Sequence, residues 1–356
     1  MPPVPSSLCY ALQKLLAAIR AGFAMRLLIT VVIGAISVSH VSAQSPDSLI
    51  LQLDNDEFAG LNKRDRWYSS GARILAIRDG SSPLAGDSAA AHWAWKVRRT
   101  CPAAAHAAAQ PGTSHVSIGQ NIYTQDVRDR AVPVANDRPI AAYLYATLGN
   151  RLQTQAGDVS LSAELGVTGP AALGEPIQNG LHSVLRVDRV PAWSYQVRPR
   201  LGLNLHFGCL GRSRFDFGSL LTQYSVSVGT TMAQASIAGA LAFGPGRATA
   251  VMPADARLII PGSHPGKFWS AVIGLRVNWV GYDALLDGDT YRYQSGVNSR
   301  QLTAQFFAGI SFNIWKNWRL EYVFTQRSHD FDGPGVAAAN YEAQQTGTLS
   351  LRIPLQ

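Results

Sequence analysis

After residue 43 the sequence lacks any long apolar run. No stretch there approaches the roughly 20 apolar residues that a membrane-spanning helix needs. Charged residues are also scarce, at 15% of the chain, and none of its segments forms a basic run. A nucleic-acid partner is therefore not expected.

The apolar segment that does exist precedes residue 44. Arg26 follows Met25, and the run LLITVVIGAISVSHV leads to the small residues Ser42 and Ala43. This order is typical of a secretory signal peptide, and the run is too short to serve comfortably as a membrane anchor, the alternative interpretation. We predict a signal peptide at 1–43, with Met25 as a second candidate start, and one domain at 44–356.

Cysteine is rare, and the charge of the exported part is nearly balanced. Residues 1–43 carry three of the 31 basic residues and no acidic ones, which leaves 28 basic against 23 acidic residues. This mild excess suits a surface rich in anionic lipid phosphates.

Cys101 and Cys209 are the two cysteines after the signal peptide. In an oxidising compartment they either pair or stay as separate thiols, and the sequence leaves both outcomes open.

Helical periodicity is scarce as well, and alternation takes its place. In residues 200–207 (RLGLNLHF), apolar residues alternate with polar or small ones, and the pattern recurs at 319–324 and 348–353. Successive strand residues point to opposite faces, so each segment has an apolar and a polar face. A soluble β-sandwich and a membrane barrel both fit. Export, strands of about ten residues and aromatics near strand ends favour the barrel.

We therefore predict an all-β fold, a transmembrane antiparallel β-barrel of about 12 strands in the bacterial outer membrane. Both termini then lie on the periplasmic side, as does a long Ala/Ser/Pro-rich insertion at 80–113. The expected strands are near 48–58, 65–78, 114–124, 139–149, 159–168, 194–207, 215–227, 232–243, 267–282, 301–314, 318–329 and 345–354. The aromatics assigned to strand ends are Trp67, Tyr68, Trp193, Tyr195, Trp269, Trp315 and Trp318.

Two polar clusters stand out from this barrel pattern. Residues 53–74 (LDNDEFAGLNKRDRWYSSGARI) place Asp56 at the end of the first strand and Ser69 near the start of the second. Residues 169–184 (GPAALGEPIQNGLHSV) follow the fifth strand, and Gln178 and His182 are spaced to share one face of a short helix. The strand order puts both clusters at the outer rim of the barrel, where we expect the active site.

These residue types suit the hydrolysis of an ester. His182 can take a proton from water at neutral pH. Asp56, helped by backbone carbonyls and Asn55, offers oxygen ligands for a hard cation such as Ca²⁺, which would polarise the ester. The alternation of side chains along a strand argues against a joint role of Asn55 and Asp56. The two should face opposite sides unless the strand bulges or ends there. The alternatives are a turn or cap at 54–56 and a solvated loop histidine.

Three arginines are candidates for binding substrate phosphates. Arg128 and Arg130 follow the third strand, and Arg138 lies in NDRP at 136–139. The alternatives are solvated loop charges and an Asx turn before the proline.

An ordered set of segments resembles the outer-membrane lipid A 3′-O-deacylases of the LpxR type. The matching stretches cover roughly residues 50–330 and are DNDEF with DRWYSSG, SIGQNIYT, NDRP, GPAALGEPIQNGLH, PAWSYQ and FTQRSHDF. The resemblance implies a twelve-stranded barrel that hydrolyses the 3′-linked acyloxyacyl ester of lipid A with Ca²⁺. It implies His182 as general base, Asn55, Ser69 and Gln178 as further catalytic residues, and Asp56 at the metal.

The expected partners are lipid A or lipopolysaccharide as substrate and the surrounding outer-membrane lipids, with the protein as a monomer. Two other functions stay open at this stage. One is a non-catalytic barrel with a structural or transport role, and the other is an outer-membrane phospholipase.

Overall fold

The structure is a computed structural model. It describes residues 47–59, 67–79, 101, 109–126, 129–134, 137–154, 156–244, 269–288, 296–315, 318–332 and 343–355. The predicted signal peptide at 1–43 and most of the 80–113 insertion lie outside the described residues.

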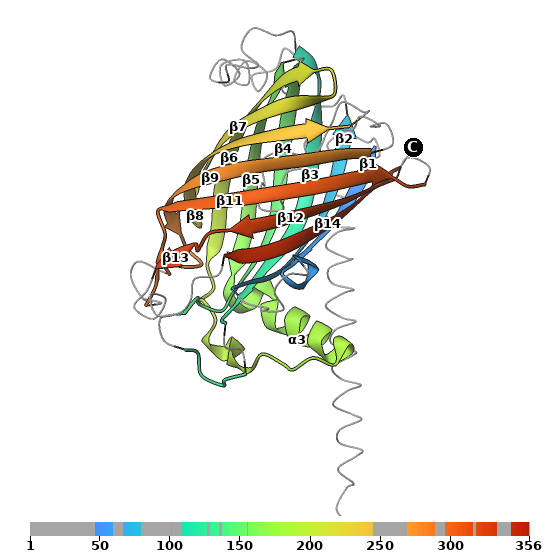
Figure 1. Cartoon of the computed structure of the whole chain (residues 1–356). Helices are drawn as coiled ribbons and strands as arrows, with labels where there is room; N and C mark the ends of the chain where they lie inside the picture. The colour runs from blue at the N-terminus through green and yellow to red at the C-terminus, as the bar shows by residue number, and fades with distance from the viewer. Residues whose placement is uncertain are drawn as a thin grey trace, which may run out of the picture.

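Twelve antiparallel strands close into a barrel (Figure 1). The first strand pairs with the second on one side and with the last on the other, so no strand of the barrel is left with an open edge. The predicted fold class and strand number are confirmed. The strands are β1 (Ser48–Asn55), β2 (Trp67–Asp79), β3 (Ala109–Thr124), β4 (Ala141–Thr154), β5 (Gly157–Thr168), β6 (Leu201–Phe215), β7 (Gly218–Gly229), β8 (Met232–Phe243), β9 (Trp269–Asp283), β11 (Leu302–Asn313), β12 (Arg319–Arg327) and β14 (Gln344–Pro354).

The alternation in the sequence maps onto the two faces of the wall. In β6, Leu201 and Leu203 are exposed, whereas Gly202 and Asn204 are buried. The apolar side chains therefore face outward and the polar ones fill the lumen, as in a barrel surrounded by lipid.

The predicted boundaries of the sixth strand are wrong at both ends. Residues Pro191–Tyr195 form a 3₁₀ helix, η5, instead of strand. Proline suits the first turn of a helix because its missing N–H has no partner there in any case. The strand β6 starts only at Leu201 and continues to Phe215, so Cys209 lies within it.

Two of the aromatics expected near strand ends are core residues. Trp193 in η5 is fully buried. Trp67 packs with Leu286, Val297 and Phe331. Phe331 belongs to the short β13 (Phe331–Asp332), which pairs with β10 (Asn298–Ser299) outside the barrel sheet. These two tryptophans stabilise the loops of one rim and do not mark the lipid boundary.

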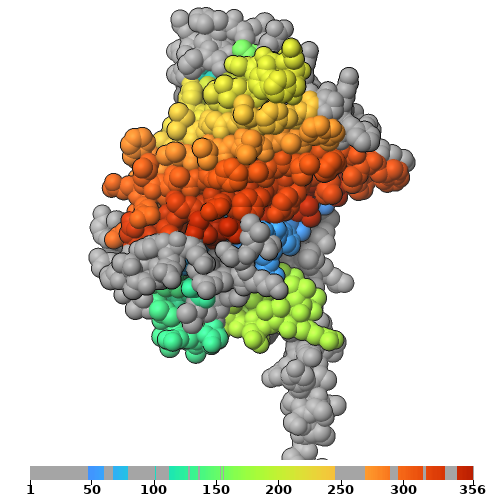
Figure 2. All heavy atoms as spheres, viewed as in Figure 1, coloured from blue at the N-terminus to red at the C-terminus, as the bar shows by residue number. Residues whose placement is uncertain are grey.

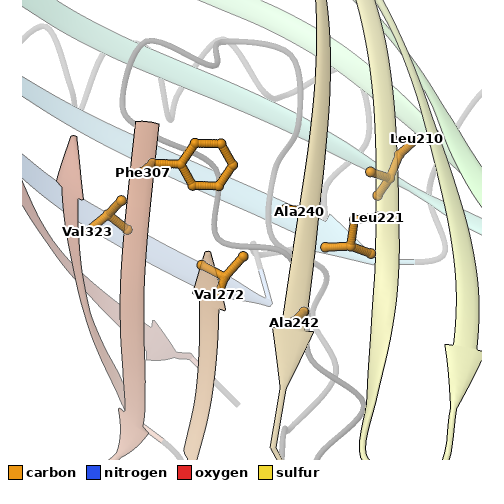
Figure 3. Packing of buried hydrophobic residues seen from close by; sticks show 7 residues of the cluster. All are labelled: Leu210, Leu221, Ala240, Ala242, Val272, Phe307 and Val323. Atoms are coloured by element: carbon orange, nitrogen blue, oxygen red, sulfur yellow. The ribbon is translucent and has the colours of Figure 1, made fainter. Parts of the chain in front are cut away.

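An apolar layer fills part of the lumen. Its side chains come from strands β6 to β12, and all are buried (Figure 3). An aqueous pore is lined by polar groups, so this layer favours a plugged barrel over an open channel. Its members are Leu210, Leu221, Ala240, Ala242, Val272, Phe307 and Val323.

Cys101 and Cys209 form a disulfide, with Cα atoms 5.6 Å apart. The open question about the two thiols is thereby answered. Cys101 packs with Val159 of β5, and half-buried Phe207 and Tyr224 lie against the same cluster. The connection between β2 and β3 is therefore joined covalently to the wall at β6.

Among the described residues, no helix has the length and apolar character needed to cross a membrane.

Candidate active site

The end of β1 brings the first two candidate residues together. β1 stops at Asn55, and a 3₁₀ turn, η2 (Glu57–Ala59), follows. Both side chains fold back on this turn: the backbone N–H of Glu57 donates to Asn55 Oδ1 at 2.7 Å and to Asp56 Oδ1 at 2.9 Å. The difficulty posed by the alternation of side chains disappears because the strand ends before Asp56. Asp56 is 3% exposed.

Ser69 lies at a β-bulge. The pairing of β2 with β3 shifts between Tyr68 and Ser70, which leaves Ser69 as the extra residue. A bulge redirects a side chain out of the regular alternation. The buried Ser69 hydroxyl meets the hydroxyl of Thr124, at the end of β3, at 2.5 Å.

Gln178 and His182 lie on a helix, α3 (Gly174–Leu185), as predicted from their spacing. The helix ends at Arg186, which takes the left-handed conformation with φ 60°. Its buried residues are unusual for a surface helix, because three of the four are polar. They are Gly174, Gln178, Asn179 and His182.

Hydrogen bonds from the segment after α3 hold these polar side chains. Asn179 donates to the carbonyl of Val190 and accepts from its N–H, at 3.2 and 2.9 Å. Trp193 Nε1 donates to Gln178 Oε1 at 3.1 Å. Asn179 was not predicted as a site residue and Trp193 was expected only near a strand end, although they lie within the segments QNGLH and PAWSYQ. The helix is thus clamped in one orientation.

His182 has a defined ring orientation. Its Nδ1 lies 2.5 Å from the carbonyl oxygen of Asp188. A carbonyl can only accept, so the neutral ring carries its proton on Nδ1 and keeps the lone pair on Nε2. Nε2 is therefore the ring nitrogen that can accept a proton.

The helix is seated on the outer side of the barrel wall. Ile122 of β3 and Ala142 of β4 alternate with the lumen-facing Asn121 and Tyr143, and both belong to the core under α3. A Cβ on Gly174 would lie 2.5 Å from Cβ of Ala142, so only glycine allows this close approach.

The two clusters lie along one rim. A continuous row of paired residues runs from Asn55 to Ser70, from Ser70 to Ile122 and from Ile122 to Ala142, where α3 begins. With neighbouring strands about 4.8 Å apart, the row covers about 15 Å. Figures 1 and 2 show η2 and α3 at the same end of the barrel. Asn55, Asp56, Ser69, Gln178 and His182 therefore lie at the same end of the barrel, and their assembly into one catalytic site stays a prediction.

The side-chain oxygens at the end of β1 are the type of ligand atom that a hard cation prefers. Asn55 and Asp56 both direct Oδ1 to one backbone N–H, and oxygen-only ligand sets suit Ca²⁺. Within the described ranges, no group of three or more His, Cys, Asp or Glu side chains could hold a metal. Backbone carbonyls and amide oxygens would have to complete the coordination.

The three candidate arginines have different surroundings. Arg128 lies outside the described residues, and Arg130 is exposed. Arg138 is buried, forms an ion pair with Asp330 and stacks over Tyr123, with its guanidinium carbon 4.2 Å from the ring centroid. It lines a cavity of about 120 Å³ in the lumen and not the outer wall where α3 lies.

Asp137, which was not among the predicted site residues, connects the loops of this rim. It accepts hydrogen bonds from Trp67 Nε1 at 3.1 Å and from the N–H of Asp126 at 2.9 Å. The N–H of the next residue, Arg138, also donates to it. Burial raises the pKa of Asp137, and these hydrogen bonds oppose the rise.

Comparisons with known proteins agree with this architecture. A family model described as outer membrane protein LpxR matches residues 25–354. The solved structure of LpxR from Salmonella typhimurium has a TM-score of 0.68 at 16% identity and covers 86% of this chain and 100% of that chain. The β domain of the Bordetella autotransporter BrkA has a TM-score of 0.40 at 10% identity, covering 88% and 100%. No curated protein sequence matches. With the family model spanning almost the whole sequence, this chain belongs to the outer-membrane LpxR family.

Proposed function

We propose that this protein is a Ca²⁺-dependent lipid A 3′-O-deacylase, which hydrolyses the 3′-linked acyloxyacyl ester. One observation carries the proposal: on the outer side of the barrel wall, next to the lipid-facing surface, α3 holds a buried histidine, His182, whose Nδ1 is bonded to the Asp188 carbonyl, so that its Nε2 is the basic nitrogen. A base at this position suits an ester that belongs to a membrane-embedded lipid.

His182 is the general base in this proposal. Nε2 takes a proton from a water molecule while the water oxygen attacks the ester carbonyl, and the proton then passes to the departing sugar oxygen. The carbonyl of Asp188 holds the ring through Nδ1 and stabilises the imidazolium that forms in between. The products are a free fatty acid, which carries the secondary acyl chain, and the 3′ hydroxyl.

Three further side chains orient the ester. Trp193 donates to the carbonyl oxygen of Gln178, so in this proposal Gln178 binds the substrate through its amide N–H groups. Asn55 and Ser69 border the same row of paired residues and offer an amide and a hydroxyl. A Ca²⁺ ion held by Asp56 and neighbouring oxygens would polarise the carbonyl and offset the charge of the oxyanion.

Mass spectrometry of lipids from cells that express the protein tests the proposal. A deacylase yields lipid A that is lighter by the 3′ acyloxyacyl group. In cells that express the His182→Ala variant, lipid A keeps all its acyl chains. Lysophospholipids with unchanged lipid A would indicate a phospholipase instead. No change in either lipid would indicate a non-catalytic barrel.

A further inference from the structure

The exposed side of α3 is apolar. Leu181 is 49% exposed, Val184 75% and Leu185 60%, although each is a large hydrophobic residue. Their spacing of three and four residues places them in one stripe along the helix. We call Leu181, Val184 and Leu185 the α3 stripe. The helix therefore buries polar side chains and exposes apolar ones, the reverse of a helix on a water-soluble protein.

The α3 stripe adjoins both the catalytic residues and the lipid-facing wall. Gln178 lies three residues before Leu181, and His182 lies three residues before Leu185. Each of these pairs is therefore adjacent on the helix surface. On the wall, Val167 packs into the core under α3. It pairs with the exposed Leu201 of β6, so the apolar outer face of the barrel continues up to the helix.

Polar and aromatic residues bound the stripe as they do in helices at a membrane surface. Arg186 and Arg189 are exposed just after the helix, and Tyr195 in η5 is also exposed. Basic residues attract anionic headgroups, and tyrosine favours the boundary between hydrocarbon and water. Figure 2 shows α3 at the surface at the end of the barrel.

We propose that α3 is an interfacial helix whose stripe of Leu181, Val184 and Leu185 lies among the acyl chains of the outer leaflet. The stripe guides the acyl chain of a lipid along the helix, so that its ester reaches His182 sideways from the membrane and never enters the lumen. The membrane contact rests on the exposed stripe, the adjoining apolar wall and the flanking basic and aromatic residues, whereas the guidance of the ester rests on the proposed function.

Depth-dependent fluorescence quenching tests the contact without any measure of activity. Val184→Cys carries an environment-sensitive dye, and the protein is reconstituted in phosphatidylcholine and phosphatidylglycerol vesicles without reductant, so that the Cys101–Cys209 disulfide stays intact. Glu175→Cys is the matched control. It is exposed on the same helix, and nine residues separate it from Val184, which is two and a half turns and thus the opposite side.

We expect brominated lipids to quench the fluorescence of the label at Val184 and not that of the label at Glu175. Iodide in the water should quench the label at Glu175 and not the label at Val184. Quenching of both labels by iodide alone would overturn the membrane contact. A Val184 label that neither agent reaches would indicate a second copy of the protein on this surface and would overturn it as well.

A kinetic comparison tests the guidance. Val184→Ser with Leu185→Ser should lower deacylation of lipid A in membranes at least about tenfold, the factor expected when a buried Val or Leu is lost. Hydrolysis of a short-chain, water-soluble ester should be unchanged. Equal loss with both esters, or no loss with either, would contradict the guidance. If the wild type hydrolyses neither ester, the proposed function fails, while the quenching result still decides the membrane contact.

Discussion

Asn55 Oδ1 and Asp56 Oδ1 accept hydrogen bonds from the same backbone N–H, that of Glu57, at 2.7 and 2.9 Å. Neighbouring residues of a regular strand cannot direct their side chains to one point, because they face opposite sides. The end of β1 at Asn55 and the start of η2 at Glu57 remove this restriction. Two oxygens of different chemistry, one neutral and one charged, thus converge at the rim.

The charge of Asp56 should be essential for activity. Asp56→Asn keeps the size of the side chain but removes the negative charge that a hard divalent cation prefers. We expect the rate of lipid A deacylation to fall by about 10²-fold or more, as when an oxyanion-stabilising group is lost. Glu57→Gln is the matched control, because it neutralises an exposed carboxylate one residue away. Equal activity of the Asp56→Asn variant and the wild type would exclude the cation role.

Removal of Ca²⁺ should abolish activity and leave the barrel intact. The barrel is held by strand pairing around its whole circumference, which needs no metal. Excess chelator should therefore stop the release of the 3′ acyl group, and added Ca²⁺ should restore it. The electrophoretic shift between heated and unheated protein should stay the same throughout. Full activity in chelator would show that the ester is polarised by protein groups alone.

Gly174 should be required for the seating of α3. Gly174→Ala adds a Cβ that would lie 2.5 Å from Ala142 and from the ring of Trp193, so the helix has to shift. Overpacking of this kind costs about 1–3 kcal/mol. We expect faster trypsin cleavage at Arg186 and Arg189 and a lower deacylation rate. Gly239→Ala is the matched control, since nothing lies within 4 Å of its added Cβ. The same cleavage rate in both variants would contradict the tight fit.

The loop held by Asp137 should become less stable as the pH rises. Burial raises the pKa of Asp137 above its unfolded value of about 3.9. Its protonated form is favoured in the folded state, so its contribution is fully present below the unfolded pKa and is lost as the pH rises through the folded pKa. Amide hydrogen exchange at Asp126, corrected for intrinsic rates, should show this loss in the wild type and not in Asp137→Asn. An identical pH dependence in the two proteins would assign the effect to another group.

The fold was predictable from the sequence because apolar and polar residues alternate along each strand. This alternation follows directly from the apolar outer face and the polar inner face of the barrel wall. Leu201 and Leu203 face outward, and Gly202 and Asn204 face the lumen, as their order indicates. Trp193 was expected near a strand end but is buried in η5, because the sequence pattern does not distinguish a tryptophan at a strand end from one packed under a helix.

The placement of the candidate residues at one end of the barrel was predictable from the sequence, but the geometry of their side chains was not. The spacing of Gln178 and His182 predicted their common helix, and the structure confirms it. The bulge at Ser69 and the bond from His182 to Asp188 depend on strand register and on the path of the loop after α3. Neither leaves a periodic signal in the sequence.

The rate of 3′ acyl release by the His182→Ala variant decides whether His182 is the general base. The rate is measured by mass spectrometry of lipid A from purified, folded protein, with wild type and His206→Ala in parallel. His206 is buried in the lumen and paired with Ser227, away from the outer wall. The account predicts a fall of about 10²–10⁴-fold for His182→Ala, as expected when a general base is removed. A folded His182→Ala protein that releases the 3′ acyl group at nearly the wild-type rate would contradict it.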